Sequence, residues 1–209
     1  MNVTIIGTGN MARAIGRRLV AGGNQVTVLG KEREAAEEVV AALGGDGSAS
    51  AGRSGDPIAD DVVVLAVYYP DAVAAVEQYG DGLAGKVVVD ITNPVNDTYD
   101  ALVTPPDSSA AQLLAESAGG ARVVKAFNTT FAGTLTSGEV GGQPLDVFMA
   151  GDDDDAKATV AALVEGGGMR PVDAGPLHRA RELEAAGLLH MTVQGSLGTG
   201  FASALKVLT

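Results

Sequence analysis

Gly7, Gly9 and Ala12 form a G-x-G-x-x-A pattern directly after the apolar run Val3–Ile6, and these are the first residues whose types and spacing point to chemistry. The first glycine permits a tight turn, the second lets the backbone approach a pyrophosphate, and the small third residue lets strand and helix pack closely. The free amides at the start of the following helix would face the phosphates. Because a strand, an amphipathic helix and a second strand surround the pattern, it predicts a bound dinucleotide. The alternative is a tight turn that binds no ligand.

The end of the second predicted strand carries the next informative residues. NAD-dependent proteins usually place a carboxylate there, ~20 residues after the glycines, to bind the ribose 2′-hydroxyl. This chain has Gly30 and Lys31 instead, with Arg33 two residues further. The missing carboxylate removes a repulsion against a 2′-phosphate, and the two cations are able to pair with it. We therefore predict NADP(H) as the cofactor. The alternative is that Lys31 and Arg33 are solvated charges on a helix that also carries two glutamates.

Two later strand ends are expected to reach the same ligand, because ligands of doubly wound sheets bind outside the carboxyl ends of the strands. Tyr68 or Tyr69 is expected against the ribose or the nicotinamide, and Asn93 is expected to orient a carboxamide. The alternative for the tyrosines is that they pack as lids of the core. The residues predicted at these strand ends are Val67, Tyr68, Tyr69, Asn93, Pro94 and Val95.

Apolar runs of strand length alternate with segments of helical period, which is typical of a parallel sheet covered on both faces. We predict an α/β fold: a Rossmann-type doubly wound, mostly parallel sheet with a small C-terminal α/β extension packed on it. Residues 1–209 are expected to form one domain, with a nucleotide-binding core over 1–120 and a C-terminal part over 121–209. The predicted strands are 3–6, 26–29, 62–67, 87–91, 122–127, 145–150 and 170–173, with at most one short strand near 48–51, and the predicted helices are 11–21, 31–43, 109–117, 153–165 and 177–194.

Composition excludes several classes of partner. The net charge of −12 argues against a nucleic-acid or anionic-membrane surface, which needs a basic face. No apolar run approaches the ~18 residues of a membrane span. The chain opens on a strand-like run rather than on a basic region followed by an apolar stretch, so we do not expect a secretory signal. Cysteine is absent, which excludes disulfides, thiolate nucleophiles and Cys-ligated metals. We predict a cytoplasmic protein with a small-molecule partner.

Residues for acid–base or metal catalysis are missing. No tyrosine is followed by a lysine four residues later, as in short-chain dehydrogenases, and His178 and His190 lack a matched carboxylate pattern. Asp152–Asp155 would point in different directions at a helix start, where carboxylates act as caps. Lys125 and Asn128 match only weakly the Lys–Asn pairs of hydroxyacid dehydrogenases. We predict no catalytic residue and no metal, since hydride transfer between two cofactors mainly needs stacked rings and excluded water.

Six segments spread over the chain share a family pattern: Gly7–Met11, Gly30–Lys31, Asn93–Val95, Val123–Thr129, Ala150–Asp154 and Arg170–Leu177. In these segments the chain resembles the NADPH-dependent reductases of the 5-deazaflavin coenzyme F420 (F420:NADP oxidoreductases) along essentially its whole length. The resemblance implies that NADP(H) lies across the strand ends and that the deazaflavin stacks on its nicotinamide. It also implies that the C-terminal part closes the cleft of this acceptor and that the protein is a homodimer.

The resemblance also assigns individual residues. Gly30 and Lys31 stand where the family has a Ser-Arg pair that grips the 2′-phosphate, and lysine lacks the bidentate geometry of arginine. Tyr68 and Tyr69 replace a Pro-Trp pair, and Asn128 stands where a histidine can occur. The residues implied at the pyrophosphate are Thr8, Gly9, Asn10 and Met11, and those implied near the reacting rings are Asn93, Asn128 and Thr129.

The sequence therefore predicts an enzyme, an oxidoreductase that moves a hydride between NADP(H) and the deazaflavin coenzyme F420 or a similar acceptor. One alternative is a non-catalytic module that senses NADP(H) and binds a protein partner. Another is a reductase of a different small acceptor. This second alternative covers pyrroline-carboxylate reductases, which share the pattern Gly9–Ala12, and the ferric reductase domains of certain membrane proteins, which share the framework.

Overall fold

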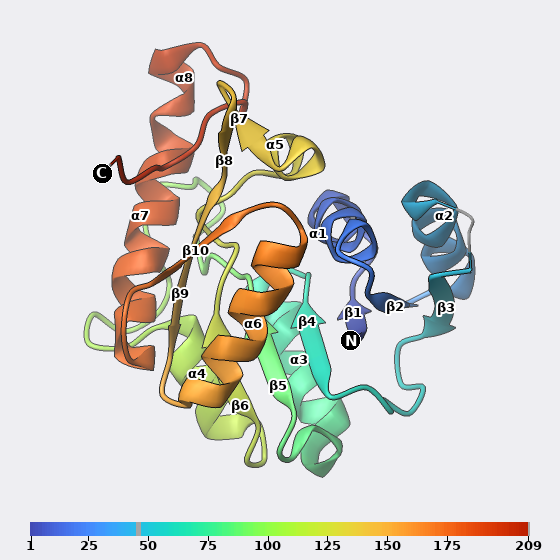
Figure 1. Cartoon of the computed structure of the whole chain (residues 1–209). Coiled ribbons are helices and arrows are strands. Elements are labelled where there is room, and N and C mark those ends of the chain that lie inside the picture. Colours follow the sequence, from blue (N-terminus) through green and yellow to red (C-terminus); the bar gives the residue numbers. More distant parts are fainter. Residues whose placement is uncertain (45–46, 209) are drawn as a thin grey trace.

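The computed structural model describes residues 1–44 and 47–208, and its centre is an eight-stranded sheet with the order β10-β9-β6-β5-β4-β1-β2-β3 (Figure 1). All neighbouring pairs from β6 to β3 are parallel, whereas β9 pairs with β6 in the antiparallel sense and β10 runs parallel to β9. The sheet is therefore mostly parallel, as predicted. Its strands are β1 (Asn2–Ile6), β2 (Gln25–Gly30), β3 (Ala49–Arg53), β4 (Val62–Leu65), β5 (Val87–Asp90), β6 (Arg122–Lys125), β9 (Asp146–Gly151) and β10 (Arg170–Asp173).

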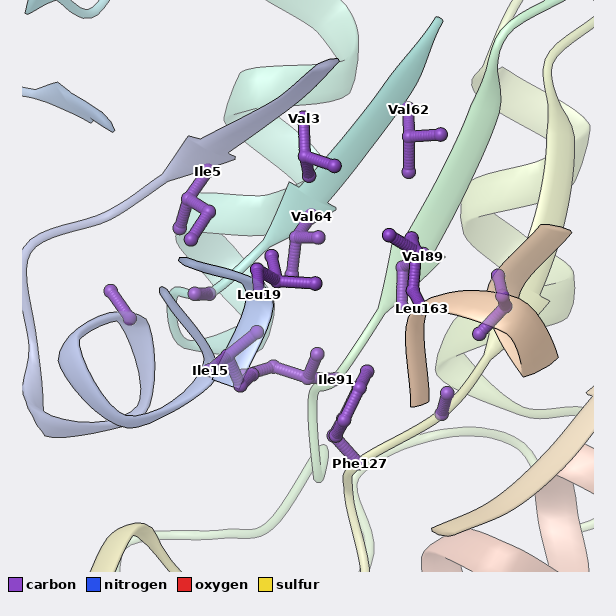
Figure 2. Close-up of a cluster of buried hydrophobic side chains, with 14 of the residues drawn as sticks. Val3, Ile5, Ile15, Leu19, Val62, Val64, Val89, Ile91, Phe127 and Leu163 are labelled. Carbon is purple, nitrogen blue, oxygen red and sulfur yellow. The ribbon is translucent and has the colours of Figure 1, made fainter. Parts of the chain in front are cut away.

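Helices cover both faces of this sheet, which explains why the central strands are buried along their whole length. On the face shown in Figure 2, Val3, Ile5, Val62 and Val64 point toward α1 and α6, where Ile15 and Leu19 or Leu163 meet them. The alternate residues Val63 and Leu65 pack against the opposite layer. The first layer contains α1 (Asn10–Ala21), α2 (Arg33–Leu43), α5 (Ala132–Ser137) and α6 (Asp154–Gly166), and the second contains α3 (Tyr69–Tyr79) and α4 (Ala110–Ser117).

The C-terminal part extends the sheet and packs a long helix beside it. Strand β9 joins β6 directly, α6 connects β9 to β10, and α7 (Ala180–Thr192) stands at the far end of the sheet in Figure 1. The short elements around them are η1 (Gly80–Leu83), the pair β7 (Glu139–Val140) and β8 (Gln143–Pro144), η2 (Leu177–Arg179) and α8 (Gln194–Leu197). No helix in the described ranges has both the length and the apolar character that a membrane crossing requires.

Several predicted boundaries were wrong. The strands expected to continue to residues 67 and 127 end at Leu65 and Lys125, and the helix expected from residue 31 starts at Arg33. The helix expected over 177–194 is divided into η2 and α7, and α8 begins where it was expected to end. Two helices, α3 and α5, were not predicted. Pro70 was taken as the end of a strand, but it occupies the first turn of α3, where its missing amide costs nothing.

Candidate functional site

The turn between β1 and α1 is shaped by two glycines with different environments. Gly7 has φ +125 and its amide donates to the Leu29 carbonyl, while a β-carbon added to it would overlap the Ala66 carbonyl oxygen. Only glycine therefore fits between the ends of β2 and β4. Gly9 is exposed and precedes α1 without a side-chain cap, and a methyl group built on it would meet no described atom outside the local helix within 4 Å. The first amides of α1 are thus open, as a phosphate site requires.

The end of β2 lies directly beside this turn. A β-carbon on Gly30 would come within 2.9 Å of Thr8 Cγ2 and 2.6 Å of the Glu32 carbonyl, so the predicted phosphate residues and Gly30 are in contact. Thr8 and Met11 are half-buried, and Asn10 is exposed on the first turn of α1. The structure therefore brings together the residues predicted around the pyrophosphate and the start of the 2′-phosphate loop.

Three cations gather at the ends of β2 and β3. Lys31 Nζ lies 2.8 Å from Asp71 Oδ1, and Arg33 Nε lies 3.2 Å from Glu37 Oε1; both side chains are largely exposed. The third is Arg53, whose Nε donates to the Lys31 carbonyl at 3.2 Å and whose Nη2 lies 3.7 Å from Glu32 Oε2. Exposed ion pairs of this kind stabilise by only ~0–1 kcal/mol, so a phosphate can replace their carboxylates.

Sequence reasoning missed Arg53. The only signal was its position: it follows the weak strand predicted near 48–51, and its proximity to Lys31 becomes visible only once β3 is known to pair with β2.

The two tyrosines at the start of α3 have different environments. Tyr68 is the residue before the helix and is 77% exposed, whereas Tyr69 is half-buried and packs against the second core layer. Burial raises the pKa of the Tyr69 phenol, and the carboxylates of Glu184 and Asp90 raise it further. Val67 is half-buried beside them. Tyr69 thus packs as a lid of the core, and Tyr68 alone presents an open aromatic ring at this strand end.

Asn93 and Asn128 form a reciprocal pair beyond the ends of β5 and β6. Asn93 Nδ2 donates to the Asn128 carbonyl at 2.8 Å, and Asn128 Nδ2 donates to Asn93 Oδ1 at 2.9 Å and to the Leu183 carbonyl at 2.8 Å. Helix α7 reaches this pair so closely that a β-carbon on Gly187 would lie 2.5 Å from Asn93 Oδ1. The protein therefore fixes the Asn93 amide and leaves one of its N–H groups without a protein acceptor among the described residues.

Asn128 and Thr129 are enclosed behind Asn93, with 4% and 2% of their surfaces exposed. The turn that places them has Phe127 at φ +63, a conformation that is unusual for a bulky residue. Asn128 Oδ1 and Thr129 Oγ1 have no hydrogen-bond partner in the described part of the chain. Both residues were expected near reacting rings, and the structure buries them behind Asn93. Pro94 is buried and Val95 half-buried in the loop that follows Asn93.

A buried ionic cluster, made of Asp90, Lys125 and Glu184, lies under this pair. Lys125 Nζ is 2.8 Å from Asp90 Oδ2 and 2.8 Å from Glu184 Oε1, all three side chains are 0% exposed, and the ammonium also donates to the Thr92 carbonyl at 2.6 Å. Glu184 Oε2 accepts from the Ala110 amide at the start of α4. Burial raises the pKa of Glu184, opposed by the Lys125 ammonium. The cluster ties α7 to the ends of β5 and β6. No local sequence pattern predicted that this lysine is fully buried.

The carboxylate cap predicted within residues 152–155 is present, and the two histidines differ in burial. Asp153 Oδ1 accepts from the Ala156 amide at 2.7 Å and caps α6, and Asp152 Oδ1 accepts from the Leu177 amide. His190 is buried, with Nδ1 near the Thr129 carbonyl and Nε2 2.8 Å from Ser203 Oγ; burial lowers its pKa. His178 is exposed in η2. The described residues contain no group of three or more His, Cys, Asp or Glu able to hold a metal ion.

Comparison with known proteins agrees with this architecture. Residues 2–94 match the family model described as NADP oxidoreductase coenzyme F420-dependent. The chain is 28% identical to the F420-dependent NADP reductase of Methanocaldococcus jannaschii, covering 88% of each protein. It is also 30% identical to metalloreductase STEAP3 of Rattus norvegicus over 88% of this chain, but it spans only 36% of that protein.

Likeness in structure extends over the whole chain. A crystal structure assigned as an F420-dependent NADP reductase from an Arthrobacter species superposes with a TM-score of 0.87, at 26% identity and with 99% of both chains covered. The family match over residues 2–94 and this full-length agreement lead to one conclusion: the chain is similar to the coenzyme F420-dependent NADP oxidoreductases along its whole length.

Proposed function

We propose that this protein is an NADP(H)-dependent oxidoreductase that transfers a hydride between NADP(H) and a 5-deazaflavin of the coenzyme F420 type. The observation that carries the proposal is the full-length likeness to an F420-dependent NADP reductase, which includes the C-terminal part as well as the dinucleotide-binding unit. A generic Rossmann protein needs only the dinucleotide-binding unit.

The residues present fit a phosphorylated dinucleotide. Glycine is the one residue type that the turn accepts at position 7. Gly9 leaves the amides of α1 open to the pyrophosphate. Lys31, Arg33 and Arg53 would hold the 2′-phosphate at the ends of β2 and β3, where no carboxylate occupies the position that NAD-dependent proteins use. This arrangement supports NADP(H) over NAD(H).

The ends of β5 and β6 would form the acceptor side. When bound, NADPH supplies a hydride and the deazaflavin ring accepts it together with a proton from solution. The chain's own contribution is to position and to exclude water. Asn93, held by Asn128 and crowded by Gly187, offers one directed N–H group beside the cofactor, and α7 covers this end of the sheet. Exposed Tyr68, directly before α3, would offer its ring at the neighbouring strand end.

A second candidate is an NADPH-dependent reductase with a different acceptor. Identity with metalloreductase STEAP3 is as high as with the F420-dependent reductase, and it also covers 88% of this chain. The departures at Tyr68, Tyr69 and Asn128 from the family pattern fall on the acceptor side. A cytoplasmic location and a homodimer remain predictions for either candidate.

The test is to mix the purified protein with NADPH and oxidised coenzyme F420 and to follow the visible absorbance of the deazaflavin. We expect protein-dependent bleaching with NADPH and at least tenfold slower bleaching with NADH, roughly the effect of losing one charge-assisted contact. If NADPH binds but no bleaching occurs, the deazaflavin is not the acceptor. Reduction of ferric chelates by NADPH and the same protein would then favour the second candidate.

A further inference from the structure

Helix α7 has a glycine in its interior, where a helix by itself favours most other residues. Gly187 is buried and lies in the middle of this 13-residue helix. A glycine there weakens the helix relative to alanine, because it loses more backbone freedom on folding. Its φ is negative, so the backbone of α7 does not require glycine at this position. The reason for this residue must therefore lie outside the helix.

The residue opposite Gly187 is Asn93, which follows the end of β5. A β-carbon built on Gly187 would lie 2.5 Å from Asn93 Oδ1 and 3.0 Å from both its Cγ and its Nδ2. The three nearest atoms thus all belong to one side-chain amide, and none of them is a backbone atom. Real β-carbons do not approach other atoms as closely as 2.5 Å. An alanine at position 187 would therefore displace the Asn93 amide.

That amide has a single orientation in the protein. Asn93 Nδ2 donates to the Asn128 carbonyl, and Asn93 Oδ1 accepts from Asn128 Nδ2. Turning the Asn93 amide over would place its donors against a donor and its acceptor against an acceptor. Asn128 is fixed in turn, since its Nδ2 also donates to the Leu183 carbonyl, one helical turn before Gly187. The second N–H group of Asn93, which has no acceptor among the described residues, is therefore directed by α7.

Directional contacts on both sides of Gly187 fix α7 against the strand ends. Before it, Glu184 pairs with the buried Lys125. After it, His190 Nδ1 lies 3.1 Å from the Thr129 carbonyl. Hydrogen bonds depend on angle as well as on distance, so these contacts set the rotation of the helix about its own axis. Gly187 thus cannot retreat from the amide unless a buried ion pair is broken.

We propose that Gly187 is a positioning residue for hydride transfer, because the room it leaves holds the free N–H group of Asn93 toward the nicotinamide carboxamide. The proposal rests on the proposed function and adds to it a residue that acts through Asn93. A dinucleotide that starts at the turn after β1 crosses the carboxyl ends of the strands, and it brings its carboxamide oxygen to this side of the sheet. A hydrogen bond to that oxygen limits rotation of the ring, so the donor carbon faces the acceptor.

A double-mutant cycle tests whether Gly187 acts through Asn93. In a single turnover of NADPH with oxidised coenzyme F420, we expect Gly187→Ala to slow hydride transfer about tenfold, the size of one lost hydrogen bond, with the Kd for NADPH changed less than about twofold. In the Asn93→Ala background the same substitution should change the rate less than about twofold, because the amide that it overlaps is gone. Gly195→Ala is the control and should leave the rate unchanged, since its methyl group in α8 meets no described atom outside the local helix within 4 Å.

Two kinetic outcomes would overturn the proposal. One is an unchanged rate in G187A, and the other is an equal slowing with and without the Asn93 side chain, which a general disturbance of α7 would produce. Thermal unfolding of the same proteins keeps the test valid if G187A folds poorly. N93A should restore the stability that G187A loses, and a double variant as unstable as G187A would refute the contact.

A second readout does not depend on the acceptor. The side-chain amide of Asn93 gives a pair of ¹H–¹⁵N NMR signals, which are identified by their absence in N93A. With NADP⁺ bound, we expect the signal of the free N–H group to shift in the wild type and in G195A but not in G187A. A wild type that shows this shift without reducing coenzyme F420 would refute the proposed function alone. No shift in the wild type, or the same shift in G187A, would refute the role of Gly187.

Discussion

Two parts of the sheet's carboxyl-terminal edge are built on different physical principles. The glycine edge, made of residues 7–11, 30–33 and 53, offers bare backbone and exposed cations with weak partners. The asparagine edge, made of Asn93, Asn128, Leu183 and Gly187, is enclosed and rests on the buried cluster of Asp90, Lys125 and Glu184. The first is poised to contact a ligand directly, whereas the second is held rigid by the protein itself.

This difference explains what each edge depends on. Recognition at the glycine edge follows from local turn geometry and charge, so substitutions there should alter binding more than folding, Gly7 excepted. At the asparagine edge, geometry depends on an ionic cluster assembled from β5, β6 and α7, so substitutions should alter stability first. The predictions below test that division, from the largest expected effect to the smallest.

Replacing the buried lysine should have the largest effect. Lys125→Met leaves Asp90 and Glu184 without a counter-ion in a fully buried site, and we expect a loss of ~3–5 kcal/mol in the free energy of unfolding, measured by urea titration. Adding Glu184→Gln should recover part of this loss, because one buried negative charge is removed. A K125M protein as stable as the wild type would show that the cluster does not hold α7.

The two glycines of the turn should separate folding from binding. Gly7→Ala forces a β-carbon onto the Ala66 carbonyl at φ +125, and we expect it to lower the free energy of unfolding by ~2–4 kcal/mol. Gly9→Ala places its methyl group in open space, so stability should change by less than ~1 kcal/mol while NADPH affinity falls. Thermal unfolding and cofactor titration of both variants check this. Equal destabilisation by both would contradict the assignment.

Substitutions at Lys31 should change cofactor preference with little change in stability. Lys31→Glu removes a cation and adds repulsion, so the Kd for NADPH should rise ~10-fold while the Kd for NADH stays within a factor of ~2. Lys31→Arg restores a planar fork and should tighten NADPH binding. Fluorescence titrations with both cofactors decide the matter. An equal loss of affinity for NADPH and NADH in K31E would show that this loop does not bind the 2′-phosphate.

The last prediction concerns the acid stability of the C-terminal part, where the effect is seen only at low pH. Burial alone raises the pKa of Asp146, but hydrogen bonds from Arg170, Lys206 and the Val207 amide outweigh it and lower the pKa from 3.8 to about 2. A lowered folded-state pKa stabilises above the unfolded value, so this contribution is complete above about pH 4 and is lost as pH falls toward 2. In urea unfolding between pH 5 and 2.5, the free energy of unfolding should fall less steeply with decreasing pH for Asp146→Asn than for the wild type. An identical pH dependence for the two proteins would show that the contacts of Asp146 do not stabilise the C-terminal part.

The glycine edge was largely predictable from the sequence, because it depends on short-range patterns. A strand, G-x-G-x-x-A and a helix fix the turn, and the absence of a carboxylate after β2 is visible directly. The doubly wound architecture was also predictable, since buried parallel strands are continuous β-branched runs. Arg53 was not, because its place beside Lys31 depends on the pairing of β2 with a strand too weak to be assigned firmly.

The asparagine edge could not be derived in the same way. Asp90, Lys125 and Glu184 are far apart in the sequence, and each alone resembles an ordinary surface charge. Only the tertiary fold shows that they neutralise one another under Asn93. The helix α3 was missed for a local reason: Pro70 is compatible with a helix start as well as with a strand end.

The most direct test of the central claim is the fate of the hydride itself. NADPH deuterated at C4 of the nicotinamide, in each of its two stereoisomers, is mixed in a single turnover with the protein and oxidised coenzyme F420, and the reduced deazaflavin is weighed by mass spectrometry. The account predicts that one stereoisomer transfers its deuterium to the carbon at position 5, where it does not exchange with water. Deazaflavin that stays oxidised, or that is reduced without deuterium from either stereoisomer, would contradict direct transfer.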